Sequence, residues 1–286
     1  MSRVRPTSPE GIRCYVERVR ISLVIPCYNE ASMIGECLAS VAAQQRPFDE
    51  VIVVDNNSTD GSLQVVADYA DRLPIRVLTE KRQGVAWASQ AGYDAATGDV
   101  IARIDADSRL VPQWADVLDR YLASHTDVDG AGGFCYFYDI DKLNLRDRAF
   151  ARADKFGVEP IGTARLVPGN NMAFRREAWL RARAFVKNVP GTHEDIDVCF
   201  ALEDAGCRLA SLPGLLVGLS ARRFASSPAS MARYLWAIGR TQHVHGRRKD
   251  TLRFALNMPL VLAQVTVHGV LARRAGLPRT RVTPVT

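Results

Sequence analysis

Short apolar runs alternate with amphipathic segments in the first part of the chain, and this alternation restricts the fold more than any other feature. The runs predict strands at residues 21–26, 51–54, 75–78 and 100–104, the first of them buried. The segments between them have apolar side chains at helical spacing. Strands that alternate with helices predict right-handed crossovers and a mostly parallel sheet, whose ligand crevice lies beyond the carboxyl ends of the strands.

Three acidic loops follow the ends of these strands, at residues 28–30, 55–60 and 105–107. Residues i and i+2 of an extended chain project from the same side, so we expect Asp105 and Asp107 to point together from the end of the fourth strand. Two close carboxylates stay ionised when positive charge lies beside them, and a divalent cation that holds a diphosphate would supply it. The alternative is a solvated turn whose first aspartate caps a helix.

Composition and charge are consistent with an ordinary globular protein. The chain has 286 residues, of which 47% are hydrophobic and 24% charged, enough for one large core or two modest domains. The net charge is +6, and much of the excess lies between residues 221 and 253. This basic cluster suits the phosphates of a nucleotide, a lipid surface or a nucleic acid. Its members are Arg222, Arg223, Arg233, Arg240, Arg247, Arg248, Lys249 and Arg253.

Cysteine usage and apolar segments bear on the cellular location. The six cysteines include no Cys-x-x-Cys pair, which predicts free thiols in a reducing cytosol. The N-terminus has no apolar signal core, so export is not indicated. The apolar stretch 254–271 is interrupted by polar residues and a proline, and we expect it to lie along a membrane face and not to span it.

Four motifs in order resemble the family-2 inverting glycosyltransferases of GT-A fold. The resemblance covers residues 20–225 and implies a Rossmann-like, mostly parallel central sheet with helices on both faces, to which this chain adds a helical C-terminal extension. The motifs are Leu23-Val24-Ile25-Pro26-Cys27-Tyr28-Asn29-Glu30, Val53-Val54-Asp55-Asn56-Asn57-Ser58-Thr59-Asp60-Gly61, Ile104-Asp105-Ala106-Asp107 and His193-Glu194-Asp195.

The order of the segments along the chain predicts a boundary near residue 125. It gives an N-terminal leader (1–19), a nucleotide-sugar-binding half (20–125), an acceptor-binding and catalytic half (126–225) and basic C-terminal helices that could contact a membrane surface (226–286).

The nucleotide would be held by side chains that follow the first, second and fourth strands. By resemblance, Pro26, Tyr28 and Glu30 flank the base and ribose. Asp55 would accept a hydrogen bond from the base, and Asp105 would reach the ribose or the metal.

Further nucleotide contacts would come from two later parts of the chain. Arg82 and Gly84, in the loop after the third strand, could reach the base or a phosphate. Arg222 and Arg223 could clamp the diphosphate, of which we select Arg223. A solvated loop arginine and a merely superficial arginine pair are the alternatives.

The resemblance also implies a metal, a base and an acceptor site. Asp107 would bind Mg²⁺ or Mn²⁺ that bridges the diphosphate, and His245 is a candidate additional ligand. Asp195 would be the general base, at a helix start whose dipole favours its anion. The acceptor-binding candidates are Glu194, Asn170 and Asn171.

The implied reaction is metal-dependent, inverting transfer of a single sugar from a nucleotide-diphosphate sugar, a UDP-sugar first, to an acceptor hydroxyl. A lipid-linked acceptor is compatible with this reaction, and the chain lacks the Gln-x-x-Arg-Trp motif of polymer synthases. The alternatives are a nucleotidyltransferase, disfavoured by the absence of glycine from residues 27–30, and a non-catalytic module that binds a nucleotide or a membrane. No zinc spacing or recognition helix supports nucleic-acid binding. We expect a cytoplasmic protein, peripheral on the inner face of the membrane.

Overall fold

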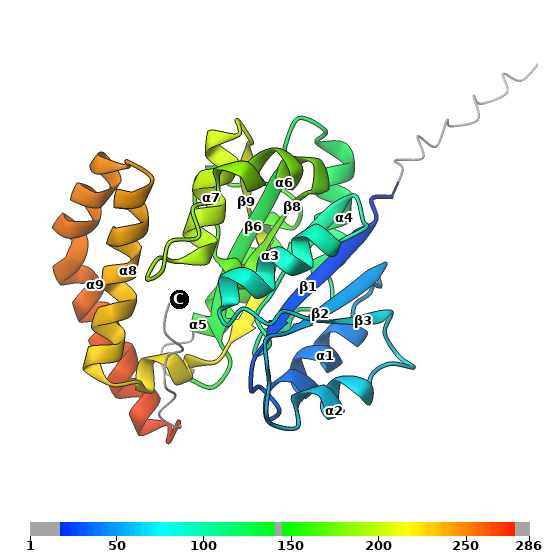
Figure 1. The fold of residues 1–286 in the computed structure, drawn as a ribbon, viewed down its shortest axis with the longest axis horizontal. Coiled ribbons are helices and arrows are strands. Elements are labelled where there is room, and N and C mark those ends of the chain that lie inside the picture. The colour runs from blue at the N-terminus through cyan, green and yellow to red at the C-terminus, as the bar shows by residue number, and fades with distance from the viewer. Residues whose placement is uncertain (1–17, 141–144, 278–286) are drawn as a thin grey trace, which may run out of the picture.

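One mixed sheet of nine strands forms the centre of the protein (Figure 1). The computed structural model describes residues 18–140 and 145–277. The strand order is β3-β2-β1-β4-β8-β6-β9-β5, and β7 pairs with β9. The strands are β1 (Ile21–Cys27), β2 (Glu50–Asp55), β3 (Ile75–Thr79), β4 (Val100–Arg103), β5 (Arg109–Leu110), β6 (Gly130–Phe137), β7 (Thr163–Ala164), β8 (Met172–Arg175) and β9 (Leu209–Leu219).

The four predicted N-terminal strands are present and form the parallel part of the sheet. β3, β2, β1 and β4 pair in parallel, and helices α1 (Ile34–Ala42), α2 (Ser62–Ala67) and α3 (Val85–Ala95) connect them. β4 ends at Arg103, one residue earlier than predicted, because the chain turns where the Ser108 N–H donates to the Asp105 carbonyl. Asp105 and Asp107 therefore lie in a turn and not on an extended strand.

The C-terminal half adds its strands to the same sheet. β8 lies antiparallel between β4 and β6, and β9 lies parallel to β6. The sheet thus continues across residue 125. The remaining helices are α4 (Trp114–Ser124), α5 (Leu145–Phe156), η1 (Gly169–Asn171), α6 (Arg176–Ala182), η2 (Arg183–Phe185), α7 (Glu194–Asp204), η3 (Ala221–Ala225), α8 (Pro228–Val244) and α9 (Arg248–Arg274).

Helices cover both faces of the sheet and create a core on each side, as predicted. Leu23 and Ile25 of β1 belong to the core that includes Trp114 of α4. Val24, which points to the other face, belongs to the core that includes Trp179 of α6. Because β1 is buried on both faces, its residues are apolar on both sides apart from Ser22, and its sequence does not alternate.

Two C-terminal helices, α8 and α9, pack together on one side of the sheet domain (Figure 1). α8 begins at Pro228, after the Ser227 hydroxyl accepts a hydrogen bond from the Ser230 N–H. α9 continues for 27 residues through Pro259. By length and composition, α9 is the one helix of the described residues that could cross a membrane.

Candidate active site

The loops after β1 and β2 are joined by hydrogen bonds at the carboxyl edge of the sheet. The Asn29 N–H donates to Ser58 Oγ (3.1 Å), and the Thr59 N–H donates to Asn29 Oδ1 (2.8 Å). Asn29 has a φ of 53°, in the left-handed region that asparagine tolerates better than most residues. These bonds fix the loop that carries the exposed Tyr28 beside the buried Asp55. The half-buried Pro26 lies just before this loop.

Asn56 joins the loop after β3 to the same edge. Its Nδ2 donates to the carbonyls of Glu80 (2.7 Å) and Arg82 (2.8 Å), and its Oδ1 accepts from the Gly84 N–H (2.7 Å). The guanidinium of Arg82 is bound to the Glu80 carboxylate and lies 4.2 Å from the Trp87 ring centre. Asn56 thus holds Gly84 in place, and the Arg82 guanidinium is engaged by Glu80 of the same loop.

Arg222 connects two of the predicted acidic residues. Its Nη2 lies 2.5 Å from Glu30 Oε1 and 3.0 Å from Asp107 Oδ2. Burial raises the pKa of Glu30 and of Asp107, and Arg222 opposes both shifts. The second oxygen of Glu30, Oε2, is buried and has no hydrogen-bond partner among the described residues. The cluster therefore consists of two carboxylates and the Arg222 guanidinium, and Glu30 Oε2 is the oxygen without a partner.

Arg103, which the sequence analysis did not select, connects the turn after β4 to α7. Its Nη2 lies 2.8 Å from Asp105 Oδ1 and 3.1 Å from Glu194 Oε1, and its side chain is only 3% exposed. Burial raises the pKa of Glu194, as does the charge of Asp195, while Arg103 lowers it. The available signal in the sequence was a charged residue within an otherwise apolar strand.

Asp195 lies in the first turn of α7, and its carboxylate is held as an anion. Oδ2 accepts from the Gly169 N–H (3.0 Å), Oδ1 accepts from the Ile196 N–H (2.8 Å), and His193 Nδ1 lies 3.6 Å from Oδ1. Burial opposes ionisation, but His193, Arg103 and the Gly169 N–H outweigh it and hold the pKa of Asp195 below its usual range. Side-chain atoms of His193, Glu194 and Asp195 lie within 4.8 Å of one another and could also hold a metal.

His245 does not lie with Asp107, and the expectation that it completes a metal site there is wrong. The imidazole is buried, with Nε2 2.7 Å from Asp197 Oδ1 and Nδ1 3.7 Å from Asp204 Oδ2. The side chain at i+2 of a helix points to a different face, so Asp197 lies away from Asp195 and binds His245 behind α7.

The predicted acceptor residue Asn171 is instead a buried structural residue. Its Nδ2 donates to the carbonyls of Phe134 (2.9 Å) and Leu215 (2.7 Å), and its Oδ1 accepts from Trp114 Nε1 (2.9 Å). These bonds occupy the amide, so Asn171 is not available to an acceptor. The neighbouring Asn170 is half-buried, and its Oδ1 accepts a hydrogen bond of 3.4 Å from the Cys135 thiol.

Arg223 lies next to Arg222 on η3 but has a different environment. Its guanidinium lies 5.1 Å from the ring centre of Tyr234. Arg223 still acts on Asp107 through its charge, which lowers the pKa of that carboxyl, whereas Arg222 forms an ion pair with Asp107 at 3.0 Å.

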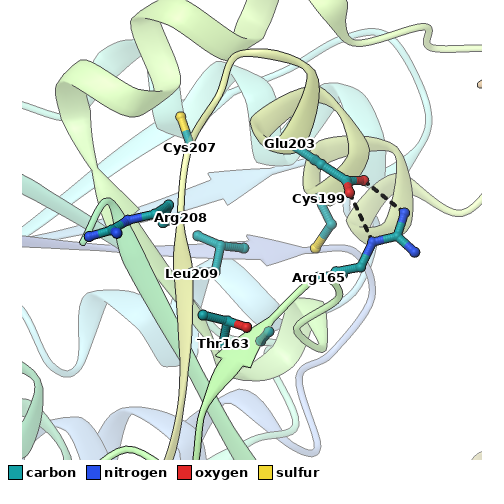
Figure 2. Close-up of a pocket in the computed structure, with 8 residues that line it drawn as sticks. Thr163, Arg165, Cys199, Glu203, Cys207, Arg208 and Leu209 are labelled. Carbon is teal, nitrogen blue, oxygen red and sulfur yellow. Dashed lines mark hydrogen bonds and ion pairs between the residues drawn. The ribbon is translucent and has the colours of Figure 1, made fainter. Parts of the chain in front are cut away.

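Two small cavities lie elsewhere, and none of the predicted site residues lines them. One has a volume of about 170 Å³ and is bounded by Cys199, Cys207 and Leu209 (Figure 2). The second, of about 270 Å³, lies between Phe200, Gln242 and Phe254. Arg165 lines both and pairs with Glu203 and Asp250.

Comparison with known proteins supports the resemblance seen in the motifs. Residues 22–182, more than half of the chain, match the model of the family described as glycosyl transferase family 2. The chain belongs to glycosyl transferase family 2. The match includes Glu30, Asp105 and Asp107 and ends before Asp195 and before the α8–α9 pair.

Curated relatives of this family 2 protein are similar over part of their length. An uncharacterised glycosyltransferase of Nostoc, alr2836, is 30% identical over 56% of this chain and 52% of its own. Glycosyltransferase AglE of Haloferax volcanii is 36% identical over 40% of this chain and 38% of its own. The chain thus spans about half or less of the length of these relatives.

Solved structures confirm the predicted fold class. Mannosyltransferase PcManGT of Pyrobaculum calidifontis, in complex with GDP-Man and Mn²⁺, superposes with a TM-score of 0.62 at 22% identity, over 91% of this chain and 75% of its own. Residues 1–349 of S. aureus TarS, in complex with UDP-GlcNAc, superpose with a TM-score of 0.55 at 19% identity, over 70% of this chain and 58% of that one. The family 2 chain therefore has the GT-A fold expected from its motifs.

Proposed function

We propose that this family 2 protein transfers a single sugar from a nucleotide-diphosphate sugar, a UDP-sugar first, to an acceptor hydroxyl with inversion. One observation carries the proposal: Arg103 joins the turn that bears Asp105 and Asp107 to the helix start that bears Asp195. This contact brings candidate metal ligands and a candidate base to one edge of the sheet.

The donor would lie across the joined loops at the carboxyl edge of the parallel strands. We propose that Pro26, Tyr28, Asp55 and Asp105 contact the base and ribose. Gly84, in the loop after β3, would contact the nucleotide from that loop. The complexes of similar fold contain GDP-Man in PcManGT and UDP-GlcNAc in TarS, which supports a nucleotide-sugar donor here.

The acidic cluster fits a divalent cation. Carboxylate oxygens of Asp105 and Asp107 are the hard ligands that Mg²⁺ and Mn²⁺ prefer, and Glu30 Oε2 is an oxygen still without a partner. A bound ion would stabilise the negative charge that develops on the departing diphosphate. Arg222, already at this position, would be able to bind the same diphosphate in place of Asp107.

Asp195 is the proposed base. Inversion requires one group on the far face of the sugar to take the proton of the attacking hydroxyl. The Gly169 N–H and His193 hold the Asp195 carboxylate ionised and oriented. Glu194 and Asn170 are the proposed contacts of the acceptor, for which a lipid-linked hydroxyl compound is our candidate. The free thiols of Cys27, Cys37, Cys135, Cys199 and Cys207 support a cytoplasmic location.

Calorimetry with UDP, GDP and dTDP, each with and without Mn²⁺, tests the metal and the donor class. We expect wild-type protein to bind UDP most tightly and only in the presence of Mn²⁺, and Asp107→Asn to weaken this binding by about tenfold or more. Asp71→Asn, at an exposed position on another loop, is the matched control. Equal nucleotide affinity with and without the metal would contradict the proposed metal site.

The variant Asp195→Asn tests the proposed base, with transfer and nucleotide binding measured on the same protein sample. Because the amide cannot accept the proton, transfer should fall by about 10²–10⁴-fold while Mn²⁺-dependent nucleotide binding persists. A transfer rate close to that of wild type would remove Asp195 as the base. Nucleotide binding by wild type without any transfer or donor hydrolysis would favour the non-catalytic alternative.

A further inference from the structure

Helix α9 has two faces of different character. One face packs on the protein: Phe254 reaches Gly239 of α8, and His268 stacks on Phe224 of η3 with ring centres 5.0 Å apart. The opposite face carries large apolar side chains that are mostly exposed, among them Leu252, Leu256 and Leu260, at 62%, 73% and 72%.

These exposed side chains form one stripe along the helix. Positions 252, 256, 260, 263, 267 and 270 fall within about a quarter of the helix circumference at 100° per residue. They are Leu252, Leu256, Leu260, Ala263, Val267 and Val270, and no charged residue lies between Arg253 and Arg273. Only 6% of the apolar window of α9 is buried. A monomer in water rarely leaves such a stripe uncovered.

Basic residues lie at both ends of the stripe. Arg248, Lys249 and Arg253 occupy the first turns of α9, and Arg273 and Arg274 occupy the last. The single acid of the helix, Asp250, is engaged by Arg165 (3.2 Å). An apolar stripe between two cationic ends is complementary to a surface with an apolar interior and anionic headgroups.

Two other ways to cover the stripe fit the structure less well. A second copy of the chain would bring cationic ends together whether the two helices ran parallel or antiparallel. A helix that crossed the bilayer would have to separate from its partners, because the Phe224 carbonyl lies only 3.1 Å from where a side chain at Gly269 would begin. The packing of α9 on η3 and α8 favours a helix that lies flat.

We propose that α9 docks the protein on an anionic lipid bilayer, with the helix in the plane of the membrane and the stripe Leu252–Val270 inserted among the acyl chains. The short helix η3 carries both Phe224, which contacts α9, and Arg222, which reaches Asp107. The cluster of Arg222, Glu30 and Asp107 is therefore connected to the docking surface through η3. Docking does not depend on the transfer reaction proposed above.

Flotation with lipid vesicles tests the docking on the full chain. Vesicles of phosphatidylcholine mixed with phosphatidylglycerol should carry the wild-type protein, and vesicles of phosphatidylcholine alone should carry about tenfold less. The paired substitution Leu256→Glu and Leu260→Glu should reduce flotation by about tenfold or more, because it places charge in the inserted face. Leu180→Glu, at an exposed leucine of α6, is the matched control and should float as wild type does.

Three results would overturn the proposal. Wild type could fail to float with anionic vesicles, or the paired variant could float as well as wild type. Gel filtration could show a wild-type dimer that the paired variant dissociates, which would mean that a second copy covers the stripe. A far-UV melt and UDP–Mn²⁺ calorimetry accompany each variant, so misfolding and failure of the proposed donor site are recognised separately from loss of docking.

Discussion

At the residue scale, the buried Arg103 is the side chain on which the geometry of the candidate site most depends. It forms ion pairs with both Asp105 and Glu194, which belong to elements far apart in the chain. A buried carboxylate that loses its countercharge is costly, whereas a comparable pair on the surface contributes little.

We therefore predict that Arg103→Met lowers the free energy of unfolding by about 3–5 kcal/mol, measured by urea denaturation. Arg120→Met, which removes an exposed ion pair with Asp116, should change it by less than about 1 kcal/mol. Arg103→Lys retains the charge and should recover part of the loss. Equal effects of the two methionine substitutions would contradict the role given to Arg103.

A second residue-scale prediction concerns pH. His193 is one of the groups that lower the pKa of Asp195, so His193→Gln should raise that pKa towards its ordinary value. If the carboxylate of Asp195 is the base, kcat falls when it is protonated, and the acid limb of kcat should move to higher pH in the variant. The pH profile of kcat measures this shift. An unmoved or downward-shifted limb would show that His193 does not stabilise the anion.

Sequence reasoning at this scale can locate a side chain that follows directly from a strand end or a helix start. Asp107, Glu30 and Asp195 were selected in this way; the structure pairs Asp107 and Glu30 with Arg222 and places the His193 imidazole 3.6 Å from Asp195. It failed for His245 and Asn171, whose partners come from other helices and strands. A local pattern carries no information on which distant groups will satisfy a buried imidazole or amide.

At the element scale, strands and helices with strong periodicity were predictable. Strands β1, β2 and β4 are buried on both faces and therefore appear as mostly apolar runs, whereas the edge strand β3 is partly exposed. The pairing of β8 between β4 and β6 was not predictable, because it depends on contacts distant in the sequence. The bounds of α9 were not predicted either: polar residues and Pro259 interrupt its apolar stretch, yet the helix continues through Pro259.

The contact between β6 and β9 gives an element-scale prediction. A β-carbon at Gly133 would lie 1.7 Å from the Leu215 carbonyl oxygen, which belongs to the neighbouring strand. We expect Gly133→Ala to lower the free energy of unfolding by about 3 kcal/mol or more, since backbone must move. Gly35→Ala in α1, where the nearest atom is 3.4 Å away, should change it by less than about 1 kcal/mol in chemical denaturation. Similar losses would contradict the tight strand packing.

At the scale of the whole molecule, ligand binding should be visible as thermal stabilisation. A ligand at about 100 times its Kd adds about 2.7 kcal/mol to the free energy of unfolding, or roughly 5–10 °C in Tm for a chain of this size. We expect UDP with Mn²⁺ to produce this shift in a thermal melt and UDP with a chelator not to do so. Asp107→Asn should abolish the metal-dependent part. A full shift in the chelated sample would contradict a metal-dependent donor site.

The ion pairs of Arg222 bear on the stability of the protein when no divalent cation is bound. Because the guanidinium is ion-paired with both Glu30 and Asp107, we expect these carboxylates to remain together without a metal ion. Removal of divalent cations should abolish the proposed transfer activity without unfolding the protein. Adding the cations back should restore the activity without a refolding step. A cell short of manganese or magnesium would then keep an intact reserve of the protein, ready when the ion returns.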